Sequence, residues 1–252
     1  MTIRRSSDSV TSDFYADTSG NLGTAVGGTG TLLSSWLSSA TAYVTKWYDQ
    51  TGNSNHATQT TASSQPILKN TTIGATAPLR YYIDFTGNLF FNLPDKAYPY
   101  GNSNYSYILK TYNMVDTNYA VLLSGGGGSA NTLLLQYDTN PSDNQMLWLY
   151  GTGSSYSNQT SAAFTRSQNE VDTYTYSNST RNIYINGTSV TSTTGGNNGS
   201  NGSLNARTQA YTNNILGYTG TGRPSTYQLY YLYVLPIDVS SYPSDKTILE
   251  NS

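Results

Sequence analysis

The chain of 252 residues carries little charge, and this excludes several classes of protein. Charged residues make up 10% of the chain and the formal net charge is −2, so the clustered Lys and Arg side chains that nucleic-acid binding requires are missing. No apolar run approaches the roughly 20 residues that cross a bilayer, so we expect no membrane insertion. The absence of Cys excludes disulfides and thiolate metal sites. The length suits one large domain, and we expect residues 1–252 to form a single unit.

Short strand-like runs bounded by Gly, Asn, Pro and Ser recur along the whole chain, and no stretch keeps the apolar spacing of a helix for long. The 24 Tyr and three Trp supply large apolar side chains for a core. Many short strands are typical of two packed antiparallel sheets, which predicts an all-β sandwich. The clearest predicted strands are Ala42–Tyr48, Leu79–Phe85, Ser106–Tyr112, Ala120–Ser124, Thr132–Tyr137, Gln145–Tyr150, Val171–Ser177, Asn182–Ile185, Asn214–Gly217 and Gln228–Leu235.

Alternation along three of these strands predicts an aromatic face on the outside of a sheet. Leu147 and Leu149 alternate with aromatic side chains, and Ile183 and Ile185 flank a tyrosine in the same way. Since the aliphatic side chains are expected to face the core, the aromatic ones should face solvent and stack on a ligand. The expected ligand patch is Trp148, Tyr150, Tyr174, Tyr176 and Tyr184, with Gln136 as a polar partner. A structural role, in which these tyrosines cover a sheet or bury a subunit interface, fits the same pattern.

Residues 47–56 have the composition of a tight turn that follows a strand. The residues expected to build the turn are Trp47, Asp49, Gly52, Asn53, Asn55 and His56. The Asp49 carboxylate can accept backbone N–H groups across the turn, and Gly52 can adopt a positive φ. His56 is the single histidine of the chain, and we expect it to be a hydrogen-bonded structural residue rather than a catalytic one. Trp47 is expected in the core rather than on a ligand platform.

Acidic residues are few, and this argues against a glycosidase. Glycoside hydrolysis by the usual route needs two carboxyl groups on one cleft. The glutamates are Glu170 and Glu250, and no acid pair can be placed on one cleft from the sequence. A glycosidase that uses Asp84 or Asp172 is the alternative. One histidine and no Gly-x-Ser-x-Gly turn also leave no activated serine, so we expect no enzyme.

The longest motif is Val44–Gln59, which reads VTKWYDQTGNSNHATQ. It resembles a signature of concanavalin A-like and laminin-G-type sandwich domains, found also in arabinofuranosidase B-type catalytic domains and in surface modules of bacteria and large DNA viruses. Ile3–Asp8 resembles the opening of the same domains, and Ile183–Gly187 resembles the laminin-G hairpin. The resemblance implies a two-sheet antiparallel jelly roll. It does not carry over the activity, because the Glu nucleophile in a Met-Glu-Asn-Gly-like context and the Cys residues of arabinofuranosidase B-type domains are missing.

Binding is the function that the remaining residues favour. We expect a non-catalytic, lectin-like domain at the cell or virion surface, or otherwise extracellular, whose partner is a glycan or a host-surface glycoprotein. One alternative is a structural fibre head or capsid-associated domain, which would be a homo-oligomer; the other is a glycoside hydrolase of arabinofuranosidase B type. No cofactor is expected, although laminin-G-like domains often bind calcium at their loop rims, which leaves a calcium site open.

Overall fold

The computed structural model describes residues 1–72, 79–97, 104–113, 119–125, 133–138, 145–152, 155–161, 169–177, 180–192, 215–217, 227–242 and 244. Strands dominate these ranges, and helical structure is limited to α1 (Leu33–Leu37) and the short 3-10 turns η1 (Ala62–Ser64), η2 (Asp95–Ala97) and η3 (Val239–Ser241). Within the same ranges, no helix has the length and apolarity needed to cross a membrane.

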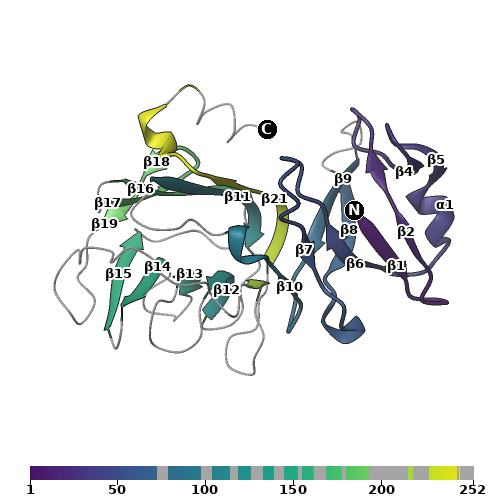
Figure 1. Ribbon diagram of the computed structural model, residues 1–252, viewed down its shortest axis with the longest axis horizontal. Coiled ribbons are helices and arrows are strands. Elements are labelled where there is room, and N and C mark those ends of the chain that lie inside the picture. The colour runs from purple at the N-terminus through teal and green to yellow at the C-terminus, as the bar shows by residue number, and fades with distance from the viewer. Residues whose placement is uncertain are drawn as a thin grey trace.

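The first layer of the fold is an antiparallel sheet that runs through the whole molecule (Figure 1). In spatial order its strands are β18 (Thr188–Ser189), β17 (Thr180–Ile185), β16 (Asn169–Ser177), β11 (Tyr105–Asn113), β21 (Tyr227–Leu235), β9 (Leu79–Asp84), β8 (Ile67–Thr72), β6 (Ala42–Trp47), β1 (Thr2–Arg5) and β2 (Thr11–Asp13). The last strand of the chain, β21, therefore lies near the middle of this layer.

The second layer lies opposite β11 and β16, as Figure 1 shows for β12 to β15. Its strands, again in spatial order, are β19 (Thr191–Ser192), β15 (Ser155–Ser161), β14 (Gln145–Thr152), β13 (Leu133–Asp138), β12 (Tyr119–Gly125), β20 (Ile215–Gly217), β10 (Phe90–Asn92) and β7 (Ala57–Thr58). Because β7 also pairs with β6, the two layers are joined along one side. A separate small sheet of β3 (Tyr15–Ala16), β4 (Leu22–Ala25) and β5 (Thr29–Leu32) lies beside α1.

The core between the layers is rich in aromatic side chains. Tyr105 and Tyr176 stack with ring centroids 5.1 Å apart, and Phe85 stacks on Tyr227 at 4.8 Å. The Tyr227 hydroxyl donates a hydrogen bond to the Leu122 carbonyl of the second layer at 3.1 Å, so a buried phenol tip has its polar partner inside the core. The prediction of an all-β fold of two packed antiparallel sheets is confirmed.

The ten predicted strands all occur, with ends that differ by at most two residues from the predicted bounds. The short strands β1, β2, β7 and β10 and the strands β8 and β15 were missed, because two to four residues are too few to display a period and β8 and β15 are mostly polar.

Candidate functional site

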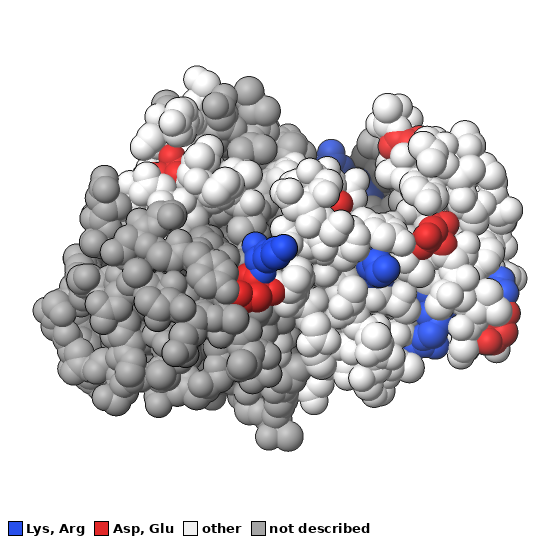
Figure 2. Space-filling model, in the orientation of Figure 1, with Lys and Arg blue, Asp and Glu red and all other residues white. Residues whose placement is uncertain are grey.

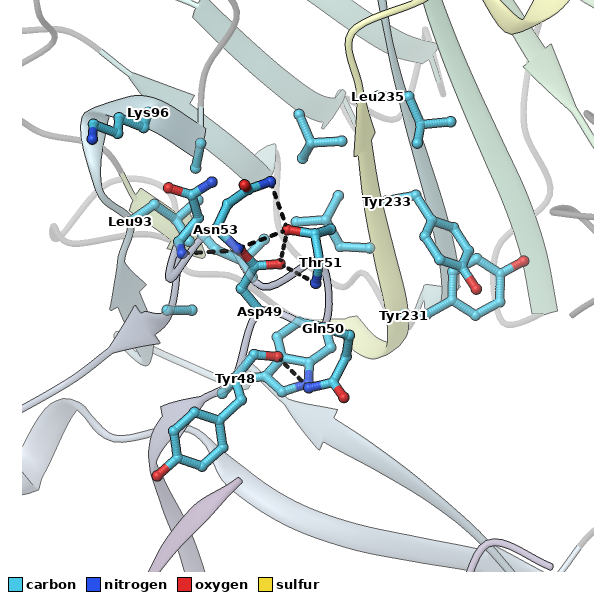
Figure 3. A pocket seen from close by; sticks show the side chains of 17 residues that line it. Tyr48, Asp49, Gln50, Thr51, Asn53, Leu93, Lys96, Tyr231, Tyr233 and Leu235 are labelled. Carbon is cyan, nitrogen blue, oxygen red and sulfur yellow. Dashed lines mark hydrogen bonds between the residues drawn. The ribbon is translucent and has the colours of Figure 1, made fainter. Parts of the chain in front are cut away.

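A groove of about 440 Å³ lies between the turn that follows β6, the 3-10 turn η2 and the edge of β21 (Figure 3). The turn, which we call the Asp49 loop (residues 48–56), supplies the polar wall. Leu232 and Val234 of β21 supply part of an apolar wall, and both also pack against the main core. The exposed Lys96 of η2 and the exposed Gln50 lie at the rim. The groove thus combines an apolar wall with amide, hydroxyl and carboxylate groups, as sites for small polar ligands do.

The Asp49 loop is held by one carboxylate. Asp49 Oδ1 accepts hydrogen bonds from the Thr51 N–H at 2.8 Å and the Thr51 hydroxyl at 2.7 Å, and Oδ2 accepts one from the Asn55 N–H at 3.0 Å. Gly52 has φ of +83°, a conformation that costs glycine little. Two backbone donors across the turn are the arrangement that the residue order predicts, so the local sequence explains why the chain turns here.

These contacts also set the ionisation of the carboxylate. Burial acts to raise the pKa of Asp49, but the hydrogen bonds from Thr51 and the Asn55 N–H, together with nearby His56, outweigh burial and lower the pKa below its ordinary value. Asp49 is therefore ionised at neutral pH. A carboxylate in this state accepts hydrogen bonds from a ligand's hydroxyl groups and repels an anionic ligand.

His56 and Trp47 flank this loop. The His56 Nδ1 atom accepts a hydrogen bond from the Asp49 N–H at 3.1 Å, and the imidazole meets the Tyr48 ring edge-on with centroids 5.0 Å apart. His56 is thus hydrogen-bonded, as the sequence predicts, and its purely structural role stays a prediction. Trp47 is half-buried: it packs against the main core and also lines the groove, so its placement is only partly the one predicted.

The tyrosines of β16 face the core, and the solvent-exposed position predicted for Tyr174 and Tyr176 is wrong. Their exposed fractions are 0% and 1%. Only two residues separate β16 from β17, and this short connection pairs Tyr174 with Ile183. Residues directly opposite each other on neighbouring strands point to the same face. Tyr174 therefore shares the core-facing side with Ile183.

Of the remaining members of the predicted patch, Tyr184 is the one whose side chain the structure describes, and it does not line the Asp49 groove. Tyr184 is half-buried and pairs with Thr173, on the side of the sheet away from Ile183. Gln136, Trp148 and Tyr150 lie on β13 and β14, and their side chains are outside the described part of the structure, so their role in ligand binding stays a prediction.

Two acids that the sequence could not pair lie on one face of β16. Glu170 and Asp172 are 1% and 0% exposed and occupy alternate positions on the core side, in register with Thr111 and Leu109 of β11. The Thr111 hydroxyl donates a long hydrogen bond of 3.4 Å to Asp172 Oδ2. Burial first, and then the charges of Asp172 and Glu170, raise the pKa of Tyr174 on the same face. The i, i+2 spacing in the sequence is the signal that could have identified this pair.

Asp84, the other acid considered for catalysis, forms an ion pair with Lys69 and accepts hydrogen bonds from the Thr86 N–H at 2.8 Å and the Thr86 hydroxyl at 2.5 Å. Burial acts to raise the pKa of Asp84, but Lys69 and Thr86 outweigh burial and lower it. Among the residues that the structure describes, no group of three or more His, Asp or Glu side chains is positioned to hold a metal ion.

No family model and no curated protein matches the chain. Solved structures do match its fold. One is a mutant of a GH54 α-L-arabinofuranosidase soaked with 4-nitrophenyl α-L-arabinofuranoside, with a TM-score of 0.62 and 14% identity over 99% of this chain and 58% of that chain. A second is an arabinofuranosidase complexed with arabinofuranosyl-α-1,2-xylobiose, with a TM-score of 0.60 and 13% identity over 99% of this chain and 57% of that one.

A third match is domain 4 of AbnA, a GH43 extracellular arabinanase from Geobacillus stearothermophilus, in complex with arabinotriose. Its TM-score is 0.54 and its identity 18%, and the match covers 73% of this chain and 81% of that domain. The chain shares its fold with these carbohydrate-acting proteins. At such low identity the matches establish the fold alone, and the chain spans little more than half the length of the two arabinofuranosidases.

The matches correct one expectation. We expected a protein that is not an enzyme, but the solved structures that cover nearly the whole chain are glycoside hydrolases, which overturns the expectation that this fold belongs to a non-enzyme. The expectation rested on the lack of an acid pair in the sequence, and Glu170 and Asp172 do lie on one face of β16.

Proposed function

We propose that the protein is a carbohydrate-active domain of the glycoside hydrolase type, and that its sugar lies in the Asp49 groove. The observation that carries the proposal is the groove itself, where an ionised carboxylate and the amides of Gln50 and Asn53 face an apolar wall. A sugar ring presents hydroxyl groups on its rim and C–H groups on its faces, so it matches both walls.

The sugar that we propose is a neutral one that contains arabinofuranose. The lowered pKa of Asp49 favours hydroxyl groups over anionic groups in the groove. The three matching proteins are described with an arabinofuranoside, an arabinofuranosyl-xylobiose and arabinotriose respectively, which supports this sugar class. Since the third of them is an extracellular enzyme, we also propose an extracellular location.

The reaction that we propose is hydrolysis of the glycosidic bond, with Glu170 and Asp172 as the candidate acid pair. The Cα atoms of alternate residues of a strand lie roughly 6–7 Å apart, so the two side chains project from neighbouring positions on one side of β16. Asp172 is in register with Leu109, and Leu109 with Leu232 of the groove wall. The pair therefore lies two strands, or about 10 Å, from the groove wall on the same side of the sheet. The bond that is cleaved would accordingly belong to a sugar unit of the ligand beyond the one held in the groove, because a general acid must reach the glycosidic oxygen.

Release of 4-nitrophenol from 4-nitrophenyl α-L-arabinofuranoside tests the reaction. We expect turnover by the unaltered protein and a loss of at least about 100-fold in kcat for Asp172→Asn and Glu170→Gln, the range that removal of a general acid or base gives. Asp17→Asn, which alters an acid in the turn between β3 and β4, serves as the matched control. Circular dichroism melting shows whether each variant is folded. Absence of turnover by the folded protein contradicts the proposed reaction. So does turnover by the Asp172→Asn and Glu170→Gln variants that equals the turnover of the unaltered protein.

Calorimetric titration with arabinotriose tests the groove separately from the reaction. The exposed side chains of Gln50 and Lys96 can be truncated with little effect on the fold, so we expect Gln50→Ala and Lys96→Ala to weaken binding by roughly two- to tenfold each, the cost of one hydrogen bond. Asn21→Ala, on the small sheet remote from the groove, should leave the affinity unchanged. Unchanged affinity in both groove variants means that the sugar binds elsewhere.

A further inference from the structure

The side of the first layer that faces away from the main core carries a second group of aromatic residues. It arises from an irregularity in the pairing of β21 with β11. Lys110 pairs with Tyr231 and the next residue, Thr111, pairs with Leu229, so Tyr230 has no partner residue on β11. A β-bulge of this kind redirects side chains. Buried Leu229 faces the main core, while the next two residues, Tyr230 and Tyr231, both contact side chains on the other side.

Tyr230 lies against Tyr82 of β9, with centroids 5.7 Å apart, and Tyr231 lies against Tyr233 at 5.1 Å. Tyr112 belongs to the same side because it alternates with Thr111, which is buried on the core side. We call Tyr82, Tyr112, Tyr230, Tyr231 and Tyr233 the outer aromatic face. All five residues are half-buried, so part of each is exposed. Tyr231 and Tyr233 also pack against a second buried cluster under this side of the sheet.

Two cations border these rings. The Lys110 ammonium lies 5.7 Å from the centre of the Tyr231 ring. Arg80 is two residues before Tyr82 on β9 and is exposed, and its guanidinium forms neither an ion pair nor a hydrogen bond with any residue in the described ranges. Burial first, and then the charge of Arg80, lower the pKa of Lys110, so the two cations are close enough to repel each other. Nearby Lys69 is ion-paired with Asp84.

We propose that the outer aromatic face is a second sugar-binding surface and that it binds an acidic oligosaccharide, one built of uronic acids. The pyranose rings would stack on Tyr230 and Tyr231, and a sugar carboxylate would bind Arg80, with Lys110 close by. A guanidinium fits a carboxylate with two parallel hydrogen bonds, and a carboxylate between two cations relieves their repulsion. The Asp49 groove has the opposite character, since its carboxylate disfavours an acidic sugar. This surface goes beyond the proposed function and does not depend on it, although Tyr231 and Tyr233 also border the Asp49 groove.

Calorimetric titration of the full chain with trigalacturonic acid tests the proposal, and the trimethyl ester of the same trisaccharide is the matched neutral ligand. We expect the acid to bind, the ester to bind at least about tenfold more weakly, and Arg80→Gln to weaken binding of the acid about tenfold, as for the loss of a hydrogen bond to a charged group. The control is Arg4→Gln, which removes another guanidinium that lies 4.5 Å from a tyrosine ring centre, that of Tyr43.

Tyr230→Ala should also weaken binding of the acid, and its melting temperature shows whether the fold is kept. Because Arg80 is exposed, Arg80→Gln remains decisive if Tyr230→Ala unfolds. The proposal is overturned if trigalacturonic acid does not bind, if the ester binds equally well, or if Arg80→Gln leaves the affinity unchanged. It is also overturned if Gln50→Ala weakens binding of the acid, because the acid would then lie in the Asp49 groove. Each of these results leaves the arabinotriose titration of the groove unaffected.

Discussion

The inner tyrosines Tyr105, Tyr107, Tyr174 and Tyr176 and the tyrosines of the outer aromatic face occupy opposite sides of one sheet. The inner set is at most 6% exposed and fills the space between the two layers, whereas the outer set is half-buried and lies beside Lys110, Arg80 and Gln228. Tyrosine suits both places, because its ring is apolar and its hydroxyl can bind water or a polar group. The residue type therefore does not reveal the side of the sheet; the pairing of strands does.

The two sets also differ in how their side is determined. The inner tyrosines follow strict alternation along β11 and β16, and the two strands pair in register over eight residues. The outer set includes the consecutive Tyr230 and Tyr231, which alternation would place on opposite sides. The bulge in β21 brings both to one side. The proposed sugar-binding surface thus lies where the regular alternation is broken.

The largest difference between the two sets should be in stability. Tyr176→Ala removes a ring that stacks on Tyr105 at 5.1 Å in the core, so we expect a loss of about 3–5 kcal/mol in the free energy of unfolding. Tyr233→Ala removes a half-buried residue from the outer side. Its loss in the free energy of unfolding should be less than about half of the loss in Tyr176→Ala. Urea unfolding of both variants measures the difference. Equal losses would mean that the outer rings are as much a part of the core as the inner ones.

A smaller effect is expected where an ion pair borders the outer aromatic face. Asp84→Asn removes the charge that binds Lys69, and because the lysine side chain is 48% exposed we expect a loss of only roughly 1–3 kcal/mol at pH 7. The folded pKa of Asp84 is lowered, so its contribution is present above the unfolded pKa of about 3.9 and is lost as pH falls through the folded value.

Urea unfolding at pH 7 and at about pH 2–3 checks this sign. The gap in stability between the unaltered protein and Asp84→Asn should shrink at the lower pH. A gap that stays constant would mean that the charge of Asp84 does not stabilise the fold, and that its packing accounts for the loss.

The smallest stability change is expected in the Asp49 loop, where water can replace part of what is lost. Asp49→Ala leaves the N–H groups of Thr51 and Asn55 without their acceptor and should cost about 1–2 kcal/mol. In the same variant we expect binding of arabinotriose to fall, whereas binding of trigalacturonic acid to the outer aromatic face should not. Thermal melting and the two titrations measure these effects. A parallel loss of both ligands would indicate that the variant is partly unfolded and that the two sites are not independent.

The longer strands could be predicted from the sequence because each carries enough β-branched and aromatic residues to show its period. The Asp49 loop could be predicted for a different reason: its donors and acceptor lie within seven residues, from Asp49 to Asn55, so the contacts are local. The face of Tyr174 could not be predicted, because β16 is buried on both sides: Thr173 and Thr175 are as buried as Tyr174. Alternation along such a strand does not show which side lies between the two layers.

The sequence by itself determined the all-β class, most strand positions and the turn around Asp49, since each depends on residues close together in the chain. Only the tertiary structure decided which tyrosines are inside, because burial depends on the second layer, whose Leu122 carbonyl binds the Tyr227 hydroxyl across a separation of 105 residues. The same holds for the Asp49 groove, where residues 47–55 meet residues 231–235. Contacts of such long range leave no period in the sequence, so the groove and the outer aromatic face become visible only once the strands are paired.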